Sequence, residues 1–232
     1  MIYNRFPNQD PLEPAEFVQL ELQWQTAIVQ LMNEFSNFAQ CGDRLLKYIS
    51  TLHPSIQQKL ILGKAAHLEE FKKTLKLAKE QVIIVNPWLN RNVFDEEIIS
   101  LFTLALNRNV QIYLGWGWHH DIGNIIIPGN GCWSFNPSNT WKYNAMSKLQ
   151  AIRRQYQKQF HLKLIGTHAK FWVCDRKFAV VGSANILCSK PRDVDKAHTE
   201  VGLQTTNLNE INSLIRCFQS TPNLAANSAL KH

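Results

Sequence analysis

The sequence has no long apolar run, so we expect no membrane-spanning helix. No stretch approaches the ~18 consecutive apolar residues of a transmembrane helix, and the densest runs cover only residues 82–85 and 125–127. The first residues, MIYNRFPNQDPLEP, lack the charged and then apolar order of a secretory signal peptide. We therefore expect a soluble, cytoplasmic protein without stable membrane insertion.

Cysteine is sparse and scattered. The chain has five cysteines, and no two of them form a Cys-x-x-Cys pair, so neither a zinc site nor a disulfide framework is indicated. We expect reduced thiols that pack as small apolar side chains. With 45% apolar and 19% charged residues, the 232-residue chain is typical of a globular protein rather than a disordered or fibrous one.

Positive charge is distributed unevenly along the chain, whose formal net charge is +7. Residues 1–40 carry five acids and one base, whereas residues 141–180 carry nine bases and one acid. A basic second half indicates a polyanionic partner, either nucleic acid or an anionic membrane surface.

The first 79 residues show helical periodicity throughout. Apolar residues over 15–39 recur at spacings of three and four and form one continuous stripe. Further helices are expected near 43–51, 54–62 and 64–80. We therefore expect an all-helical N-terminal region over 1–79, whose stripe packs on its own domain or docks a protein partner or a second copy.

From residue 80 the pattern changes to alternating strands and helices. Strands expected at 81–86 and 109–115 flank a helix at 93–107, which predicts a βαβ unit with a parallel strand pair. A long irregular segment over 116–140 and a basic helix over 142–159 follow. The remaining expected elements are strands at 161–166, 169–175, 178–182 and 199–205, a helix at 208–219 and a frayed tail over 220–232.

One motif carries the chemistry, with the spacing H-x-K-x4-D-x6-G-S-x-N. His168 and Lys170 are two residues apart at the start of an expected strand, so their side chains share a face. An imidazole beside a fixed cation suits attack on an anionic phosphorus centre, because the cation reduces repulsion and stabilises the transition state. The fixed positions are His168, Lys170, Asp175, Gly182, Ser183 and Asn185.

The second half of the motif offers groups that can bind phosphate. Gly182 allows close approach of the backbone, while the Ser183 hydroxyl and the Asn185 amide supply hydrogen-bond donors. Glu200, in the strand that follows, could accept a proton from the other ring nitrogen of His168 and fix its tautomer.

This motif resembles the signature of the phospholipase D superfamily and agrees with it at all six positions. The strand, helix and strand before it also resemble that family, so the resemblance covers about residues 80–218. It implies an α/β, phospholipase D-like mixed sheet flanked by helices, with a catalytic domain at 80–219.

The resemblance also implies roles for the motif residues. In that family the motif histidine forms a covalent phosphohistidine, and a second histidine from another motif copy protonates the leaving oxygen. His168 would be the nucleophile or acid, Glu200 would orient it, and Asp175 would support the site or pair locally. Lys170, Ser183 and Asn185 would bind phosphate.

The chain carries this motif once. The His119-His120-Asp121 run lacks the lysine and the Gly-Ser pair, so it is not a second copy. We interpret its histidines as substrate contacts or simple surface residues rather than a metal site. We therefore expect a homodimer that joins two copies of His168 at its axis. No metal and no cofactor are expected.

The substrate is left open by fold and motif, because the superfamily includes nucleases and lipid enzymes. The basic stretch, its aromatic neighbours and the single-motif form favour nucleic acid, either DNA or RNA. The alternatives are a phospholipase or phosphatidyltransferase, a regulated effector nuclease inactive in isolation, and a non-enzymatic binding module. The candidate substrate contacts are Lys170, Ser183, Asn185, Trp116, His119, Trp141 and Arg153.

Overall fold

Strand β2 shows why the chain folds around a sheet that is covered on both faces. The computed structural model describes residues 58–136, 141–188 and 200–226. In β2, Val82 and Ile84 pack into one apolar core, while Ile83 and Val85 pack into a second. Successive side chains of a strand point to opposite faces, so an uninterrupted apolar run requires cover on both.

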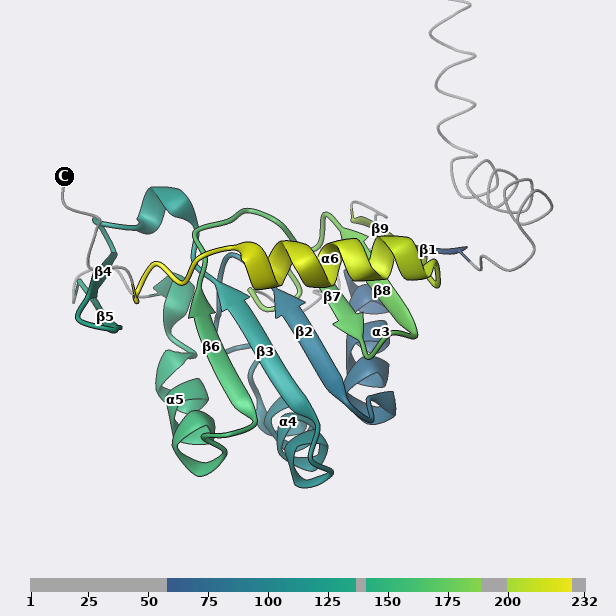
Figure 1. The fold of residues 1–232 in the computed structure, drawn as a ribbon, viewed down its shortest axis with the longest axis horizontal. Coiled ribbons are helices and arrows are strands. Elements are labelled where there is room, and N and C mark those ends of the chain that lie inside the picture. The colour runs from purple at the N-terminus through teal and green to yellow at the C-terminus, as the bar shows by residue number, and fades with distance from the viewer. Residues whose placement is uncertain (1–57, 137–140, 189–199, 227–232) are drawn as a thin grey trace, which may run out of the picture. The chain divides into compact units, whose positions relative to one another are not determined.

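Nine strands and four α-helices make up the described residues, together with two short 3-10 turns (Figure 1). In chain order they are β1 Gln58–Leu62, α3 Lys64–Leu77, β2 Gln81–Val85, α4 Glu96–Asn107, β3 Gln111–Trp116, η1 His119–Asp121, β4 Ile126–Gly129, β5 Cys132–Phe135, η2 Trp141–Tyr143, α5 Met146–Gln155, β6 Phe160–Leu164, β7 Phe171–Cys174, β8 Phe178–Gly182, β9 Val201–Thr205 and α6 Leu208–Ser220.

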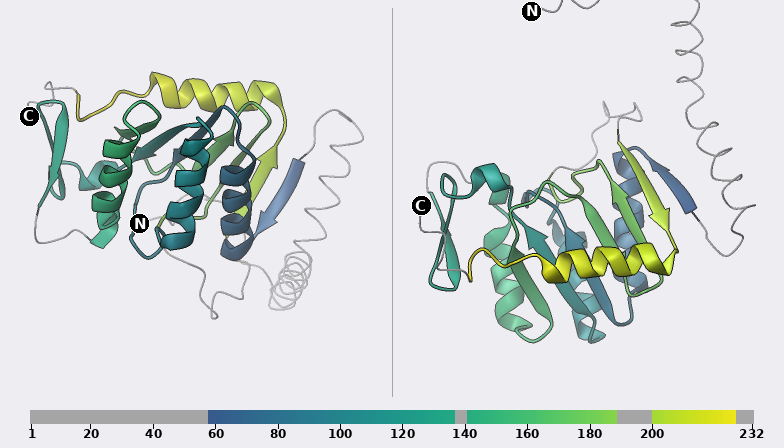
Figure 2. Two further views of the ribbon diagram at one scale, coloured as in Figure 1. Left: turned by 90° about the horizontal axis from the view of Figure 1, so that it is seen from below. Right: turned by 45° about the horizontal axis from the view of Figure 1, so that its top comes forward.

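Seven of the strands form one mixed sheet in the order β1-β9-β8-β7-β2-β3-β6. β2, β3 and β6 are parallel, which confirms the predicted βαβ unit, and β7, β8 and β9 continue the sheet in antiparallel pairs. Helices α3, α4 and α5 cover one face, and α6 lies across the other (Figures 1 and 2). The fold is therefore the predicted α/β mixed sheet flanked by helices.

The helix expected near 64–80 is confirmed as α3, but the expectation of helix throughout 1–79 fails at residues 58–62. Residues 58–62 form strand β1, which pairs antiparallel with β9, in place of the helix expected near 54–62. The sequence QKLIL has no strong local preference, and pairing with a strand far along the chain decides its conformation. The expected boundary at residue 79 therefore falls inside the sheet domain, while the helices expected over 15–39 and 43–51 lie outside the described residues.

Two other segments are more ordered than their sequences predict. The segment expected to be irregular over 116–140 contains the β4–β5 hairpin. The tail expected to fray from residue 220 packs instead over 224–225: the Leu224 N–H donates to the Leu164 carbonyl at 2.8 Å, and Ala225 is buried. No helix in the described part of the chain has the length and apolar character needed to cross a membrane.

Two glycines allow strands β8 and β9 to lie directly over a buried histidine. Gly182 and Gly202 are paired across these strands, and the fully buried ring of His67 from α3 lies beneath them. A Cβ on Gly202 would overlap the His67 Nε2, and one on Gly182 would come within 2.8 Å of the Val201 carbonyl oxygen. At Gly182 the absence of a side chain therefore serves the packing of β8 on β9 and His67.

We predict that Gly202→Ala lowers the free energy of unfolding by about 1–3 kcal/mol, because the added methyl forces the buried ring or the strand pair to move. Gly129→Ala is the matched control, since a Cβ at Gly129 meets no atom within 4 Å. Urea unfolding measures both variants. Equal midpoints for the two would show that the contact with His67 is not restrictive.

Candidate active site

The two halves of the motif meet at one edge of the sheet. Lys170 immediately precedes β7 and Ser183 immediately follows β8, and these strands form an antiparallel hairpin. The Gly182 N–H donates to the Lys170 carbonyl at 3.2 Å, and the Ser183 N–H donates to the Val201 carbonyl at 2.9 Å. The parallel strands β2 and β3 end at the same edge (Figure 1).

His168 and Lys170 lie side by side at this edge. The Lys170 Nζ is 3.4 Å from Nδ1 and 3.5 Å from Nε2 of His168, and it donates to the His168 carbonyl oxygen at 2.9 Å. The carbonyl bond holds the ammonium close to the ring. An anion bound here would therefore meet an imidazole and a cation together, the arrangement that the motif spacing predicts.

The surroundings of His168 favour its neutral form. Partial burial lowers the pKa of His168 below its ordinary value, and the positive charge of Lys170 and the nearby His119 lower it further. Burial also lowers the pKa of Lys170, while the Glu200 carboxylate opposes this shift. A neutral imidazole keeps a free lone pair at neutral pH, which a nucleophile requires.

Two indole rings pack against the His168 ring. The ring centroids of Trp88 and Trp118 lie 5.7 Å and 5.9 Å from that of His168. Trp118 follows β3 and is one of the aromatic residues noted in the sequence. Trp88 was not predicted, and its position just beyond the end of β2 was the signal that could have indicated it.

Glu200 contacts Ser183 rather than His168. The Ser183 hydroxyl donates to Glu200 Oε2 at 2.5 Å and accepts from the Val201 N–H at 3.1 Å. Within the described residues, no hydrogen bond joins Glu200 to the His168 ring, so the expected orienting bond is not present. The carboxylate instead orients the Ser183 hydroxyl. It also lies close enough to Lys170 to offset part of the lowering of the lysine pKa by burial.

Asp175 lies at the far end of β7, roughly 16 Å along the strand from Lys170 at ~3.3 Å per residue. Its buried carboxylate accepts from the N–H groups of residues 79–81 and pairs with Lys177 at 3.1 Å. Burial acts to raise the Asp175 pKa, but these donors outweigh it and the pKa lies below its ordinary value. Asp175 therefore pairs locally, one of the two roles expected for it, and lies away from the other motif side chains; its contacts tie the β7–β8 turn to the start of β2.

Asn185 lies in the loop after β8, two residues beyond Ser183. Its Oδ1 is buried and has no hydrogen-bond partner among the described residues. The amide is therefore free of competing contacts on this atom, next to the hairpin that carries Lys170.

The expected substrate contacts separate into two groups. His119 and Trp141 are exposed, and His119 stacks on His120 with 3.8 Å between ring centroids. Trp116 is fully buried against Trp133, because it points from the end of β3 under the β4–β5 hairpin.

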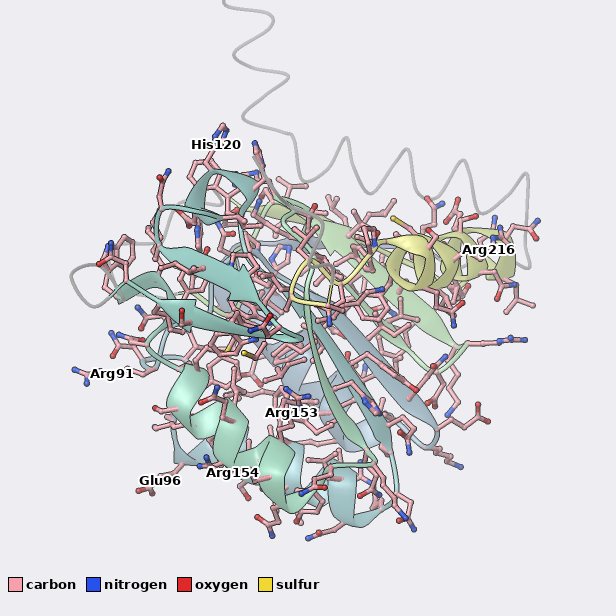
Figure 3. The ribbon with its side chains drawn as sticks, turned by 60° about the vertical axis from the view of Figure 1, so that its left-hand side comes forward. Arg91, Glu96, His120, Arg153, Arg154 and Arg216 are labelled. Atoms are coloured by element: carbon pink, nitrogen blue, oxygen red, sulfur yellow. The ribbon has the colours of Figure 1, made fainter. Side chains whose placement is uncertain are left out.

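Arg153 also lies away from the site. It is on the last turn of α5, which leads toward the start of β6 and therefore toward the opposite edge of the sheet. Figure 3 shows Arg153 on α5, well separated from His120. The expected contacts of Trp116 and Arg153 with substrate are therefore wrong.

Among the described residues, no three His, Cys, Asp or Glu side chains gather as a metal site. The polar groups at the edge are instead the imidazole of His168, the ammonium of Lys170, the Ser183 hydroxyl paired with Glu200, and the Asn185 amide. Such a set can bind an anion and present it to a nucleophile.

We predict that His168 titrates below its ordinary pKa of 6.5 and that Lys170→Met raises this pKa by removing a nearby positive charge. As the pH is lowered, a reaction that needs the neutral ring would then lose its activity at a higher pH in Lys170→Met than in the parent chain. Histidine NMR of the full chain measures the titration. Lys177→Met, which removes a lysine paired with Asp175, is the control, and equal His168 midpoints in the two variants would contradict the argument.

The chain is similar to proteins of known family and known structure. The family model described as "Cardiolipin synthase, PLD-like domain" matches residues 71–220, and no curated protein sequence matches the chain. The structure of phosphatidylserine synthase from Haemophilus influenzae Rd KW20 is 13% identical, covering 72% of this chain and 39% of its own, with a TM-score of 0.51.

Two smaller proteins also share structural similarity. NucT from Helicobacter pylori is 15% identical over 72% of this chain and 95% of its own, with a TM-score of 0.49. Nuc from Salmonella typhimurium, described as a phospholipase D family member, is 11% identical over 71% and 94%, with a TM-score of 0.46. At such identities a structural likeness concerns the fold alone.

Proposed function

The chain belongs to the PLD-like domain family of phosphodiester-acting enzymes, and from this premise we propose that it is an endonuclease that uses no metal ion and forms a phosphohistidine intermediate at His168. The observation that carries the proposal is the His168 imidazole 3.4 Å from the Lys170 ammonium, in surroundings that lower the pKa of the imidazole. These groups supply a nucleophile and a positive charge for a phosphate.

The proposed reaction has two steps. In the first, a ring nitrogen of His168 attacks phosphorus, the P–N bond forms and the bond from phosphorus to the leaving oxygen breaks. The His168 of the second copy lies on the other side of the same phosphate, whose negative charge favours protonation of one of the two rings, and this protonated ring donates its proton to that oxygen. In the second step, water attacks phosphorus, the same imidazole accepts the water's proton, and the P–N bond breaks to release the phosphate product.

The surface around His168 favours nucleic acid as the substrate. The half-buried rings of Trp88 and Trp118 adjoin the imidazole, and Trp141 is 57% exposed on η2. Aromatic side chains stack on bases of any sequence, which suits an enzyme acting on single strands or frayed ends. The Lys170 ammonium beside the imidazole adds attraction for the phosphate backbone.

A lipid substrate is the alternative that the family allows. Membrane-acting enzymes present an apolar rim to the bilayer. In this chain the apolar run over residues 125–127 is the candidate for such a rim. Ile125 and Ile126 are buried, and only Ile127 of the three is exposed, at 49%. The segment therefore offers a single apolar side chain, which disfavours the lipid alternative.

We expect the chain to cleave labelled DNA or RNA, single- or double-stranded, in excess EDTA. His168→Ala should lower the rate at least about 10³-fold, because the proposed nucleophile is removed. His161→Ala is the control, since that imidazole stacks on Tyr113 within β6 and β3. Equal activity of His168→Ala and the parent, or cleavage only with added metal, would contradict the proposal.

The proposed mechanism requires a second imidazole, so we expect the active species to be a homodimer of twice the 26.7 kDa chain mass. Size-exclusion chromatography with light scattering gives the mass of each fraction, and the nuclease assay gives its activity. An active fraction with the mass of one chain would contradict this part of the mechanism.

A further inference from the structure

Asp121, the last residue of the His-His-Asp run, is the centre of a buried polar cluster. Its carboxylate, 3% exposed as a residue, accepts from the Lys142 ammonium at 2.9 Å and 3.3 Å. It also accepts from the Tyr143 hydroxyl at 2.7 Å and from the Trp88 indole N–H at 3.3 Å. Three side chains from two other segments are thus tied to one carboxylate.

This cluster supports the two indoles that contact His168. Trp88 and Trp118, here called the indole pair, pack edge to face with 5.7 Å between ring centroids. The Lys142 Nζ lies 5.7 Å from the Trp88 ring and 5.2 Å from the Trp118 ring, within cation–π range. The indole pair therefore contacts both the ammonium that Asp121 holds and the imidazole of His168.

Both indoles are tethered to the cluster by hydrogen bonds as well. Trp88 donates its ring N–H directly to Asp121. The backbone N–H of Trp118 donates to the Tyr143 hydroxyl at 3.2 Å, and that hydroxyl in turn donates to Asp121. Burial and the Asp121 contact raise the Tyr143 pKa well above its ordinary value, so the phenol keeps its proton for this bond.

We propose that Asp121 is a positioning residue, which fixes the indole pair against His168 and thereby sets the orientation of the imidazole. His168 lies in the loop between β6 and β7 and is exposed, so among the described residues its ring is restrained mainly by the indole pair and by Lys170. Asp121 acts through the two indoles and touches neither substrate nor reacting atoms. The inference rests on the proposed function only for the catalytic consequence, because the contacts exist whatever the substrate is.

The consequence for catalysis follows from geometry. A nucleophile must lie in line with the bond that breaks, and a displacement of about 1 Å can cost ~100-fold in rate. Releasing Lys142 and Trp88 from Asp121 would loosen the indole pair and allow the His168 ring to sample other orientations. The turnover number should then fall by a larger factor than substrate binding weakens, because loosened indoles can still contact bases whereas a misaligned imidazole cannot attack in line.

The test compares Asp121→Asn with Asp175→Asn in the full chain. Asp175 is a matched control because it is as buried as Asp121, at 3% exposure, and is also paired with a lysine. It differs in position, because it lies at the end of β7 that is far from His168. Two indole rings near an imidazole shift its ring-proton NMR signals. The ring-current shift is the difference between the His168 ring-proton signals in the parent chain and those of a histidine without aromatic neighbours. We expect Asp121→Asn to change this difference by at least half and Asp175→Asn to leave it unchanged.

Kinetics supply the second readout. We expect Asp121→Asn to lower kcat about 10- to 100-fold with a smaller change in KM, since the orientation of His168 is lost while the indoles remain in the site. Asp121→Glu, which keeps the charge, should recover part of both the rate and the NMR shift. If the Asn variant does not fold, Lys142→Met replaces it, because methionine keeps apolar contact with the indole pair and removes the ion pair.

The outcomes separate this inference from the proposed nuclease activity. His168 signals that are unchanged in Asp121→Asn or Lys142→Met, or displaced equally in Asp175→Asn, would overturn the positioning role and leave the nuclease proposal intact. Displaced signals in a chain that cleaves no nucleic acid would support the positioning of His168 and contradict the proposed substrate.

Discussion

The hydrogen bond from the Gly182 N–H to the Lys170 carbonyl joins the two halves of the motif, and the geometry of the site depends on it. This bond lies at the open end of the β7–β8 hairpin. His168 and Lys170 come just before β7 and Ser183 and Asn185 just after β8, so the bond brings the two pairs together. The glycines that face His67 allow β9 to pair closely with β8, which places Glu200 beside the Ser183 hydroxyl.

Charge at this edge is arranged so that each group restrains its neighbour. Lys170 lies against the imidazole of His168 and helps to keep it neutral, while Glu200 holds the Ser183 hydroxyl and supports the charge of Lys170. Behind the indole pair, a second cation, Lys142, is held by the buried Asp121. The imidazole of His168 is therefore exposed, with the Lys170 ammonium beside it and the indole pair packed against it.

The parts of the fold and site that could be predicted from sequence were those governed by local spacing. The apolar run of β2 indicated a buried strand, and the two-residue spacing of His168 and Lys170 indicated that their side chains lie side by side, although both residues precede β7. Strand β1 could not be predicted locally because its pairing with β9 determines it, and the burial of Trp116 depends on the hairpin that covers it. The family resemblance placed Asp175 in the motif, but only the structure shows its carboxylate bonded at the far end of β7.

The stereochemistry of cleavage tests the central claim, attack by His168 on phosphorus, most directly. A substrate whose scissile phosphate is a chiral phosphorothioate would be hydrolysed in isotopically labelled water, and the configuration of the product determined. Two in-line displacements, through a phosphohistidine and then through water, predict overall retention. Inversion at phosphorus would show that water attacks directly and would contradict the proposed role of His168 as nucleophile.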